Sequence, residues 1–243
     1  SSAGVPAKVT ADTLVLRYND LDAVREAFAS HGAEIAAVIV EPVAGNMNCV
    51  PPTQGFLEAL REQCDQYGAV LIFDEVITGF GRTGKMFGLE HWGVKPDLIQ
   101  FAKAITSGCF PLGGIGVSDE IANTMNESGK PWMHAYTYSG HPVCCAVALA
   151  NLDIIEREGL IERAAGLGRR LRAQLDTLAS HPHVGEVRSH GLMAAVGLVA
   201  DKTTRAEFPA EEKIGPRVHE ATQRRDMFTR LRGDVYNFGP CFV

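Results

Sequence analysis

The hydrophobic and polar positions of this chain follow two patterns, a helical spacing and short continuous apolar runs. Helical spacing occurs in residues 18–32, where an Asn-Asp pair can cap a helix and Gly32 can end it. It recurs in residues 53–69. Continuous apolar runs cover residues 35–42 and 69–76, on either side of that second helix. A strand, a helix and a strand at this spacing predict a right-handed βαβ crossover with parallel strands.

The pattern in the rest of the chain predicts further elements. In order, these are a strand at 97–103, a possible strand at 112–118, a long and mostly helical segment at 140–179, a hairpin at 184–199, a helix at 213–227 and a strand-like ending. The hairpin and the polar insert behind it differ from the βαβ pattern of the first part. We therefore expect two domains, residues 1–155 and residues 156–243.

Three of the predicted strands end on a charged residue, namely Glu41, Asp74 and Lys103. Continuous apolar runs are typical of parallel strands that are covered on both faces. In open α/β sheets the ligand crevice lies at the carboxyl ends of the strands. Any one of these charges could simply reach solvent at a strand end, but the three together predict a site at one edge of the sheet.

Composition argues against several classes of protein. The net charge is −6 and no basic run is present, which argues against a nucleic-acid surface. No apolar stretch is long enough to span a bilayer, and the first residues lack the features of a signal peptide. The six cysteines form no C-x-x-C pair, so we interpret them as reduced thiols of a cytoplasmic protein.

Two kinds of site, a dinucleotide site and a metal site, have only weak support in the sequence. The stretch GFGRTG places Gly79, Gly81 and Gly84 at the spacing of a dinucleotide-binding loop. Such a loop needs a helix whose N-terminus binds the pyrophosphate, and the residues that follow show no helical spacing. A winding loop that needs a permissive backbone is the better explanation of these glycines. His181 and His183 have no carboxylate or thiol at metal-ligand spacing, so no metal site is expected.

A third kind of site uses the charged strand ends. A lysine opposite a buried aspartate can hold an aldehyde cofactor as a Schiff base, and pyridoxal phosphate also needs a carboxylate for its ring nitrogen. Alternation along the strand puts Asp74 and Val76 on one face and Glu75 on the other. We therefore predict that Asp74 meets the pyridinium, that Val76 packs on the ring and that Glu75 serves the structure.

These residues stand in FDEVITGFGRTG, PDLIQFAKAITSGCFPLGG and AYTYSGHPVCCA, which resemble the class III pyridoxal-phosphate aminotransferases. The resemblance covers nearly the whole chain. It implies an α/β fold of fold type I, with part of a large mixed-sheet cofactor domain and a C-terminal α+β small domain. It makes Lys103 the cofactor lysine, with Asp74 and Val76 at the ring. It also implies a homodimer in which Thr137 binds the cofactor phosphate of the neighbouring subunit.

Within the family the chain is similar to two relatives at once. Residues 18–28 and 39–52 resemble glutamate-1-semialdehyde 2,1-aminomutase. From GFGRTGKMFGLEHWG onward the chain resembles the ω-amino acid–pyruvate transaminases. The change falls close to residue 76, and either a divergent subfamily or a recombinant chain explains it.

The resemblance assigns two further residues. In the transaminases an arginine four residues before the aspartate of FTRLRGD binds the substrate carboxylate, which points to Arg230. Arg232 is the alternative, and a solvated basic strand edge is a third reading. Glu41 matches a family glutamate near the cofactor and is expected to have a supporting role.

The expected function is transfer of an amino group from an amine or ω-amino acid to a keto acid such as pyruvate. An aminomutase and an inactive remnant are the alternatives. The family's phosphate-binding Gly/Ser loop and stacking aromatic residue are expected before residue 1, so we interpret the chain as a fragment lacking the N-terminal half. We therefore expect the 243 residues alone to bind the cofactor weakly.

Overall fold

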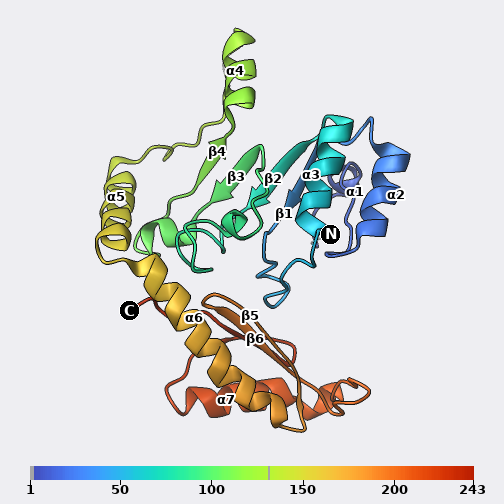
Figure 1. Cartoon of the computed structure of the whole chain (residues 1–243), viewed down its shortest axis with the longest axis vertical. Helices are drawn as coiled ribbons and strands as arrows, with labels where there is room; N and C mark the ends of the chain where they lie inside the picture. The colour runs from blue at the N-terminus through green and yellow to red at the C-terminus, as the bar shows by residue number, and fades with distance from the viewer. Residues whose placement is uncertain (1–2, 131) are drawn as a thin grey trace.

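The computed structural model describes residues 3–130 and 132–243, which contain two separate four-stranded sheets (Figure 1). The first has the strand order β1 (Ala37–Val40), β2 (Val70–Asp74), β3 (Leu98–Phe101), β4 (Gly114–Val117). The second has the order β5 (Val184–His190), β6 (Met193–Leu198), β8 (Val235–Phe238), β7 (Arg230–Arg232). Seven α-helices accompany them: α1 (Ala7–Thr10), α2 (Leu21–His31), α3 (Phe56–Tyr67), α4 (Asp119–Glu127), α5 (Pro142–Arg157), α6 (Leu160–Asp176), α7 (Ile214–Gln223).

The predicted βαβ unit is confirmed. Strands β1 and β2 are parallel, with Ile39 beside Ile72, and β2 is parallel to β3. Helix α2 begins where the sequence predicts, because the Asp20 side chain accepts a hydrogen bond from the amide of Ala23. Helix α3 ends at Gly68, which adopts the left-handed conformation (φ 71°) that glycine tolerates best. Strand β4 pairs with β3 in the antiparallel direction, so the sheet is mixed.

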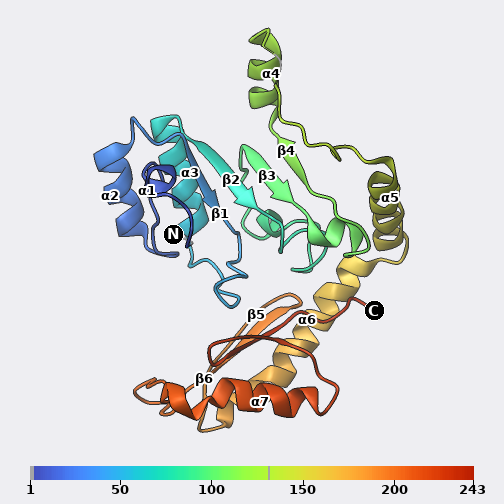
Figure 2. The same ribbon diagram turned by 180° about the vertical axis from the view of Figure 1, so that it is seen from behind.

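The main core lies between the first sheet and helices α2 and α3. Leu71 and Phe73 are fully buried there against Phe28, Leu57 and Leu60. Figures 1 and 2 show α2 and α3 together beside β1 and β2. The opposite face of the sheet is open in the described residues, and Ile39 is 60% exposed. The expectation of strands covered on both faces is therefore wrong for this chain, because the described helices pack on one face only.

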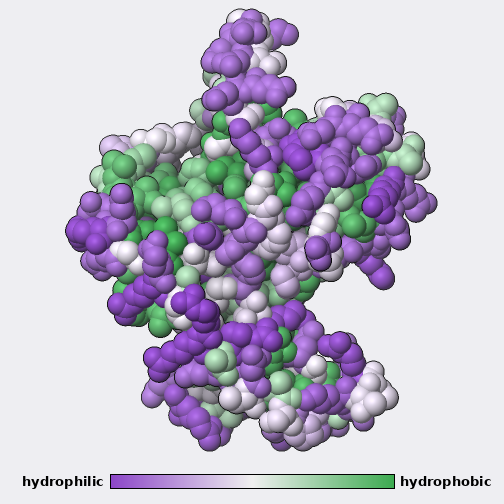
Figure 3. Space-filling model, viewed as in Figure 1, coloured by the Kyte–Doolittle hydropathy of each residue, from purple (hydrophilic) through white to green (hydrophobic). Residues whose placement is uncertain are grey.

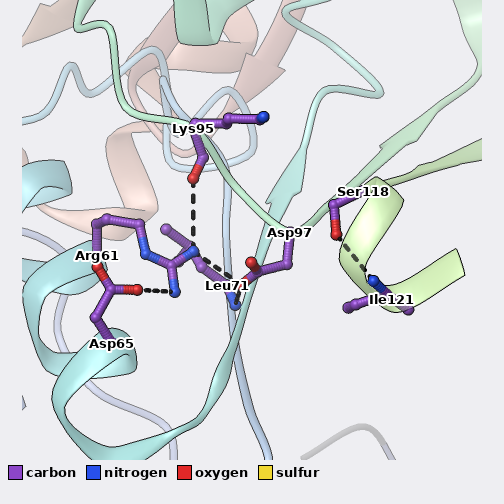
Figure 4. A network of polar contacts seen from close by, with 7 residues as sticks. All are labelled: Arg61, Asp65, Leu71, Lys95, Asp97, Ser118 and Ile121. Atoms are coloured by element: carbon purple, nitrogen blue, oxygen red, sulfur yellow. Dashed lines mark hydrogen bonds and ion pairs between the residues drawn. The ribbon is translucent and has the colours of Figure 1, made fainter. Parts of the chain in front are cut away.

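An ionic network joins α3 to the sheet (Figure 4). Asp97 Oδ2 lies 2.8 Å from Arg61 Nη1 and also accepts a hydrogen bond from the amide of Leu71 at 2.7 Å. Arg61 reaches Asp65, one helical turn further along α3, at 2.7 Å. The network therefore holds the beginning of β2 and the turn before β3 against α3.

The long helical segment is broken into two helices. Helix α5 ends at Arg157, and Gly159 turns the chain in a left-handed conformation (φ 58°) before α6. Figure 1 shows α6 crossing from the first sheet toward the second, while α4 projects away from both. The second sheet contains the predicted hairpin, β5 and β6. The division at residue 155 remains a prediction.

The second sheet is attached beside the carboxyl ends of β1 and β2. Met193 and Ala195 of β6 form a small core with Val43 and Cys49, which belong to the loop after β1. Arg188 Nε donates a hydrogen bond to the carbonyl of Asn48 in the same loop, at 3.0 Å. Among the helices described, none is both long and apolar enough to cross a bilayer.

Candidate active site

The carboxylate of Asp74 stands at the end of β2. Because side chains alternate along a strand, Asp74 lies on the face opposite the core residues Leu71 and Phe73, away from α3. It is half-buried, and its Oδ1 accepts a hydrogen bond from the amide of Val76 at 3.0 Å. This bond turns the chain immediately after the strand and holds the carboxylate at the open face.

Glu75 points the other way and is fully buried. Its carboxylate accepts hydrogen bonds from the amides of Gly88 (2.8 Å) and Leu89 (2.7 Å) and from the Thr78 hydroxyl. Burial raises the pKa of Glu75 above its ordinary value, although these hydrogen bonds act in the opposite direction. The prediction that one acid serves the structure is confirmed: Glu75 closes the loop that follows Asp74.

Lys103 follows β3 in a strained turn. It opens a short 3-10 helix, η2 (Lys103–Thr106), and its φ of 48° is uncommon for a residue with a side chain. Such strain persists only where neighbours enforce it, and it is concentrated at functional sites. The side chain of Lys103 is exposed. The turn therefore presents the amine to solvent instead of packing it into the core.

The neighbour that enforces the turn is Asn151 of α5. Its side-chain amide donates to the carbonyls of Ala104 (2.9 Å) and Ile105 (3.1 Å). Its Oδ1 accepts a hydrogen bond from the Ser107 hydroxyl at 2.7 Å. Sequence reasoning missed Asn151. A lone amide within the otherwise apolar stretch CCAVALAN was the available signal, because a polar side chain on such a helix needs a partner.

Glu41 lies next to Asp74, as predicted from the strand ends. Val40 and Phe73 are paired across β1 and β2, so the residues after them are neighbours. Burial raises the pKa of Glu41 above its ordinary value, and the nearby charge of Asp74 adds to this effect. Hydrogen bonds from Gly45, whose amide lies 2.9 Å from Oε2, and from Asn46 act against it.

Arg230 and Arg232 reach the same loop from β7. Arg230 Nη1 donates to Asn46 Oδ1 at 3.3 Å, and Arg232 donates to the carbonyl of Asn46. Asn46 therefore joins both arginines to the loop after β1, a contact that sequence reasoning missed because it joins residues far apart in the chain. Both arginines are exposed, and β7 is the last strand of its sheet.

The remaining predicted residues lie in loops. Val76 is half-buried in the turn after Asp74. Thr137 is exposed in the segment before α5, beside the exposed Tyr136 and Tyr138. Whether Thr137 binds a cofactor phosphate depends on a second subunit, so this assignment stays a prediction.

The glycine-rich stretch forms turns that end in a short 3-10 helix, η1 (Gly88–His91). Gly81 and Gly84 have φ values of 94° and 84°, as a winding loop requires. No α-helix begins within the glycines to face a pyrophosphate. Within residues 3–130 and 132–243, no group of three or more His, Cys, Asp or Glu side chains is placed to hold a metal ion.

An exposed lysine and two acids thus gather at neighbouring strand ends, and a family model matches the chain around them. The aminotransferase class-III family matches residues 3–229. The chain belongs to the class III aminotransferases. Members of this family use pyridoxal 5′-phosphate, and the donor set here fits that cofactor. Lys103 is free to hold an aldehyde, while Asp74 is a carboxylate on the open face of the sheet that can pair with a ring nitrogen.

Individual class III relatives support the same conclusion. The chain is 43% identical to the diaminobutyrate–2-oxoglutarate transaminase of Halomonas elongata over 212 residues, which are 85% of this chain and 45% of the relative. It is 40% identical to the β-alanine–pyruvate aminotransferase of Pseudomonas aeruginosa, over 86% of this chain and 47% of the relative. The chain spans about half the length of the curated relatives it matches.

Solved structures show the same fold. An (S)-enantioselective omega-transaminase from Thermomicrobium roseum superposes with a TM-score of 0.88 at 48% identity, covering 91% of this chain and 50% of that one. The fold is that of the pyridoxal-phosphate-dependent transaminases, as the sequence predicted.

Proposed function

We propose that the protein carrying this sequence is a pyridoxal-phosphate-dependent aminotransferase that moves an amino group from an amine or ω-amino acid to a keto acid such as pyruvate. The observation that carries the proposal is the pair formed by Asp74 and Lys103 at the ends of adjacent parallel strands, with Lys103 in an enforced turn. The relatives named for β-alanine and pyruvate support the substrate class. The omega-amino acid–pyruvate aminotransferase of Pseudomonas putida, 37% identical over 86% of this chain, supports it as well.

Each site residue then has a role. Lys103 Nζ holds the cofactor aldehyde and moves the proton of the substrate carbon that bears the amino group. When bound, pyridoxal phosphate supplies an electron sink for that carbon. Asp74 pairs with the ring nitrogen, and Val76 packs on the ring. Glu41 supports Asp74 from the neighbouring strand, where burial and the Asp74 charge favour the protonated form of its carboxyl group.

The substrate carboxylate is assigned to Arg230. Its guanidinium is exposed, and among the described residues an amide oxygen of Asn46, at 3.3 Å, is its only hydrogen-bond acceptor. A planar guanidinium can exchange that neutral acceptor for a carboxylate, which gives shorter and stronger hydrogen bonds. Arg232 is held by a backbone carbonyl of the same loop and is the alternative.

We also propose a homodimer in which Thr137 of one subunit completes the site of the other. Large apolar and aromatic side chains are exposed in the segment that contains Thr137 and on α5, among them Met133 (84%), Tyr138 (77%) and Leu149 (69%). Figure 3 shows apolar surface over α5 and the neighbouring strands. Patches of this kind mark interfaces. A cytoplasmic location is supported by the six free cysteines.

Reduction with borohydride tests the proposal at Lys103. After addition of pyridoxal phosphate to the protein that carries this sequence, the pyridoxyl label should map to the peptide of Lys103. Lys103→Ala should lose the label and nearly all amino transfer, whereas Lys95→Ala should keep both, because Lys95 lies before β3, at the opposite end of that strand from Lys103. A label on Lys85 or Lys95 would exclude Lys103 as the cofactor lysine.

A second measurement separates transfer from isomerisation. Product analysis with an amine donor should show amino transfer only when pyruvate is present. Turnover of glutamate-1-semialdehyde without any external acceptor would instead favour the aminomutase, which returns the amino group to the same carbon skeleton.

A further inference from the structure

The turn that carries Lys103 has a residue in the left-handed conformation at each end. Lys103 opens η2 with a φ of 48°, and Ser107 closes it with a φ of 50°. A residue with a side chain rarely adopts this conformation, because its Cβ crowds the backbone. Two such residues around one short helix make the turn unfavourable by itself, so other parts of the chain must hold it.

This conformation sets the direction of the Lys103 side chain. The side chain is exposed, so packing around it does not fix where it points. Its direction follows from φ, because rotation about the N–Cα bond swings the Cα–Cβ bond with it. A return of φ to the usual negative range would therefore aim the amine elsewhere, while Asp74 would stay at the end of β2.

Asn151 of α5 holds η2 through two consecutive carbonyl groups. Its Nδ2 donates to the carbonyls of Ala104 (2.9 Å) and Ile105 (3.1 Å), the two residues that follow Lys103. Both donors of the amide group are thereby used on η2. Carbonyl groups at the end of a helix lack partners within the helix, so a donor from outside restrains the backbone there directly.

Ser107 completes this arrangement at the far end of η2. A carbonyl oxygen can only accept a hydrogen bond, so the NH2 group of Asn151 must face η2, and its oxygen is left for another donor. That donor is the Ser107 hydroxyl, at 2.7 Å from Oδ1. The same hydrogen bond also restrains Ser107, the second left-handed residue of the turn. One side chain on α5 therefore holds the turn at three points.

Helix α5 gives Asn151 a rigid base. Ala148 and Ile155, three positions before Asn151 and four positions after it, lie on the same face of the helix. Both are buried in the core cluster that includes Ile105 of η2. The amide of Asn151 is thus the polar part of an otherwise apolar contact between α5 and η2.

We propose that Asn151 and Ser107 are positioning residues for Lys103, because their hydrogen bonds hold the turn that aims its amine at the cofactor aldehyde. The inference rests on the proposed function, which takes Lys103 as the cofactor lysine. When Lys103 Nζ adds to an aldehyde carbon, the aldehyde oxygen leaves as water with both hydrogens of the neutral amine. This addition needs a close and directed approach. A turn that is formed only part of the time therefore reacts in proportion to that fraction.

Competition between two lysines of one molecule measures the effect. The protein that carries this sequence is mixed with pyridoxal phosphate and reduced with borohydride after short times. Peptide mapping then gives the initial labelling rates of Lys103 and of Lys95, which lies at the opposite end of β3 and serves as the internal reference. Asn151→Leu keeps a similar volume and removes all three hydrogen bonds. The ratio of Lys103 to Lys95 labelling should fall at least about tenfold, at roughly fivefold for each carbonyl bond lost.

Further variants separate positioning from general stability. Asn123→Leu makes the same substitution at an exposed position of α4 and should change the ratio by less than about twofold. Ser107→Ala, at an exposed position, removes only the hydroxyl and should lower the ratio about threefold, even if Asn151→Leu does not fold. In the Asn151→Leu background, Ser107→Gly should raise the ratio again by about threefold or more, because glycine adopts the left-handed conformation without strain.

Hydrogen exchange gives a readout that needs no cofactor. The amide of Ser107 donates to the carbonyl of Ala104 at 3.1 Å, and its exchange should be faster in Asn151→Leu than in the unchanged protein. Unchanged exchange at this amide would show that Asn151 does not hold the turn, and would overturn the proposal.

The labelling results distinguish this proposal from the proposed function. Equal labelling of Lys103 and Lys95 in the unchanged protein would contradict the proposed function, and the positioning role with it. A preference for Lys103 that persists in Asn151→Leu and in Ser107→Ala would leave the proposed function intact and overturn the positioning role. Failure of Ser107→Gly to raise the ratio in the Asn151→Leu background would also overturn it, because the left-handed turn would then not be what Asn151 maintains.

Discussion

His190 should make the stability of this chain fall in acid. The ring of His190 stacks on Trp92 and lies edge-on to His91, with ring centroids 4.4 Å apart. Burial, followed by the effect of His91, lowers the pKa of His190 from 6.5 to about 4. The unfolded chain therefore binds a proton in this window that the folded chain does not. A depressed pKa of this kind gives stability that is present above pH 6.5 and is lost as the pH falls toward 4.

The shift sets the size of the effect. A difference of about 2.5 pKa units at about 1.4 kcal/mol each predicts a loss of about 3 kcal/mol of unfolding free energy. Urea denaturation at about pH 7 and about pH 4 measures it. His190→Phe keeps an aromatic ring against Trp92 but cannot take up a proton. Between about pH 7 and about pH 4, the unfolding free energy of His190→Phe should therefore fall by about 3 kcal/mol less than that of the unchanged chain.

The comparison of the unchanged chain with His190→Phe isolates the contribution of His190 from those of other titratable groups. His91, Lys85 and Glu90, which are near His190, are present in both proteins, so their contributions largely cancel in the difference. Identical pH dependence of the unchanged chain and His190→Phe would refute the reasoning.

Three further substitutions test other parts of the structure. Asp74→Asn should keep the fold but slow substrate proton removal by about a hundredfold or more, as measured by deuterium exchange at the substrate carbon, since an amide cannot hold the ring proton; a near-normal rate would make Asp74 structural. Asp97→Ala should lower the urea unfolding free energy by about 2 kcal/mol, because the amide of Leu71 loses its 2.7 Å acceptor; an unchanged midpoint would contradict this. Glu75→Gln should cost about 2 kcal/mol and speed hydrogen exchange at the amide of Gly88, and unchanged exchange there would show that the carboxylate does not hold the loop.

The local sequence pattern was sufficient to predict those parts of the site that depend on a single strand. Alternation separated Asp74 from Glu75 onto opposite faces. The apolar runs placed Lys103 at the end of a predicted strand, whereas β3 ends at Phe101 and Lys103 opens the turn behind it. The family resemblance then assigned their roles. No local pattern could predict the positive φ of Lys103, because Asn151 imposes it from a distant helix.

Contacts between distant segments were also beyond the sequence. The link from Arg230 to Asn46 spans 184 positions and depends on how the second sheet is attached. The open face of the first sheet was missed for a related reason. Apolar runs indicate which strands can be covered, but Ile39 carries no signal of whether its cover belongs to the same chain.

The buried carboxylate of Glu75 has a consequence for protein engineering. It fastens the amides of Gly88 and Leu89 directly to the residue after Asp74, so both ends of the intervening loop are anchored. Within that loop Thr83 is buried, whereas the Lys85 side chain is exposed. The Lys85 side chain can therefore be exchanged for one that carries a fluorescent label, while Asp74 keeps its position at the end of β2.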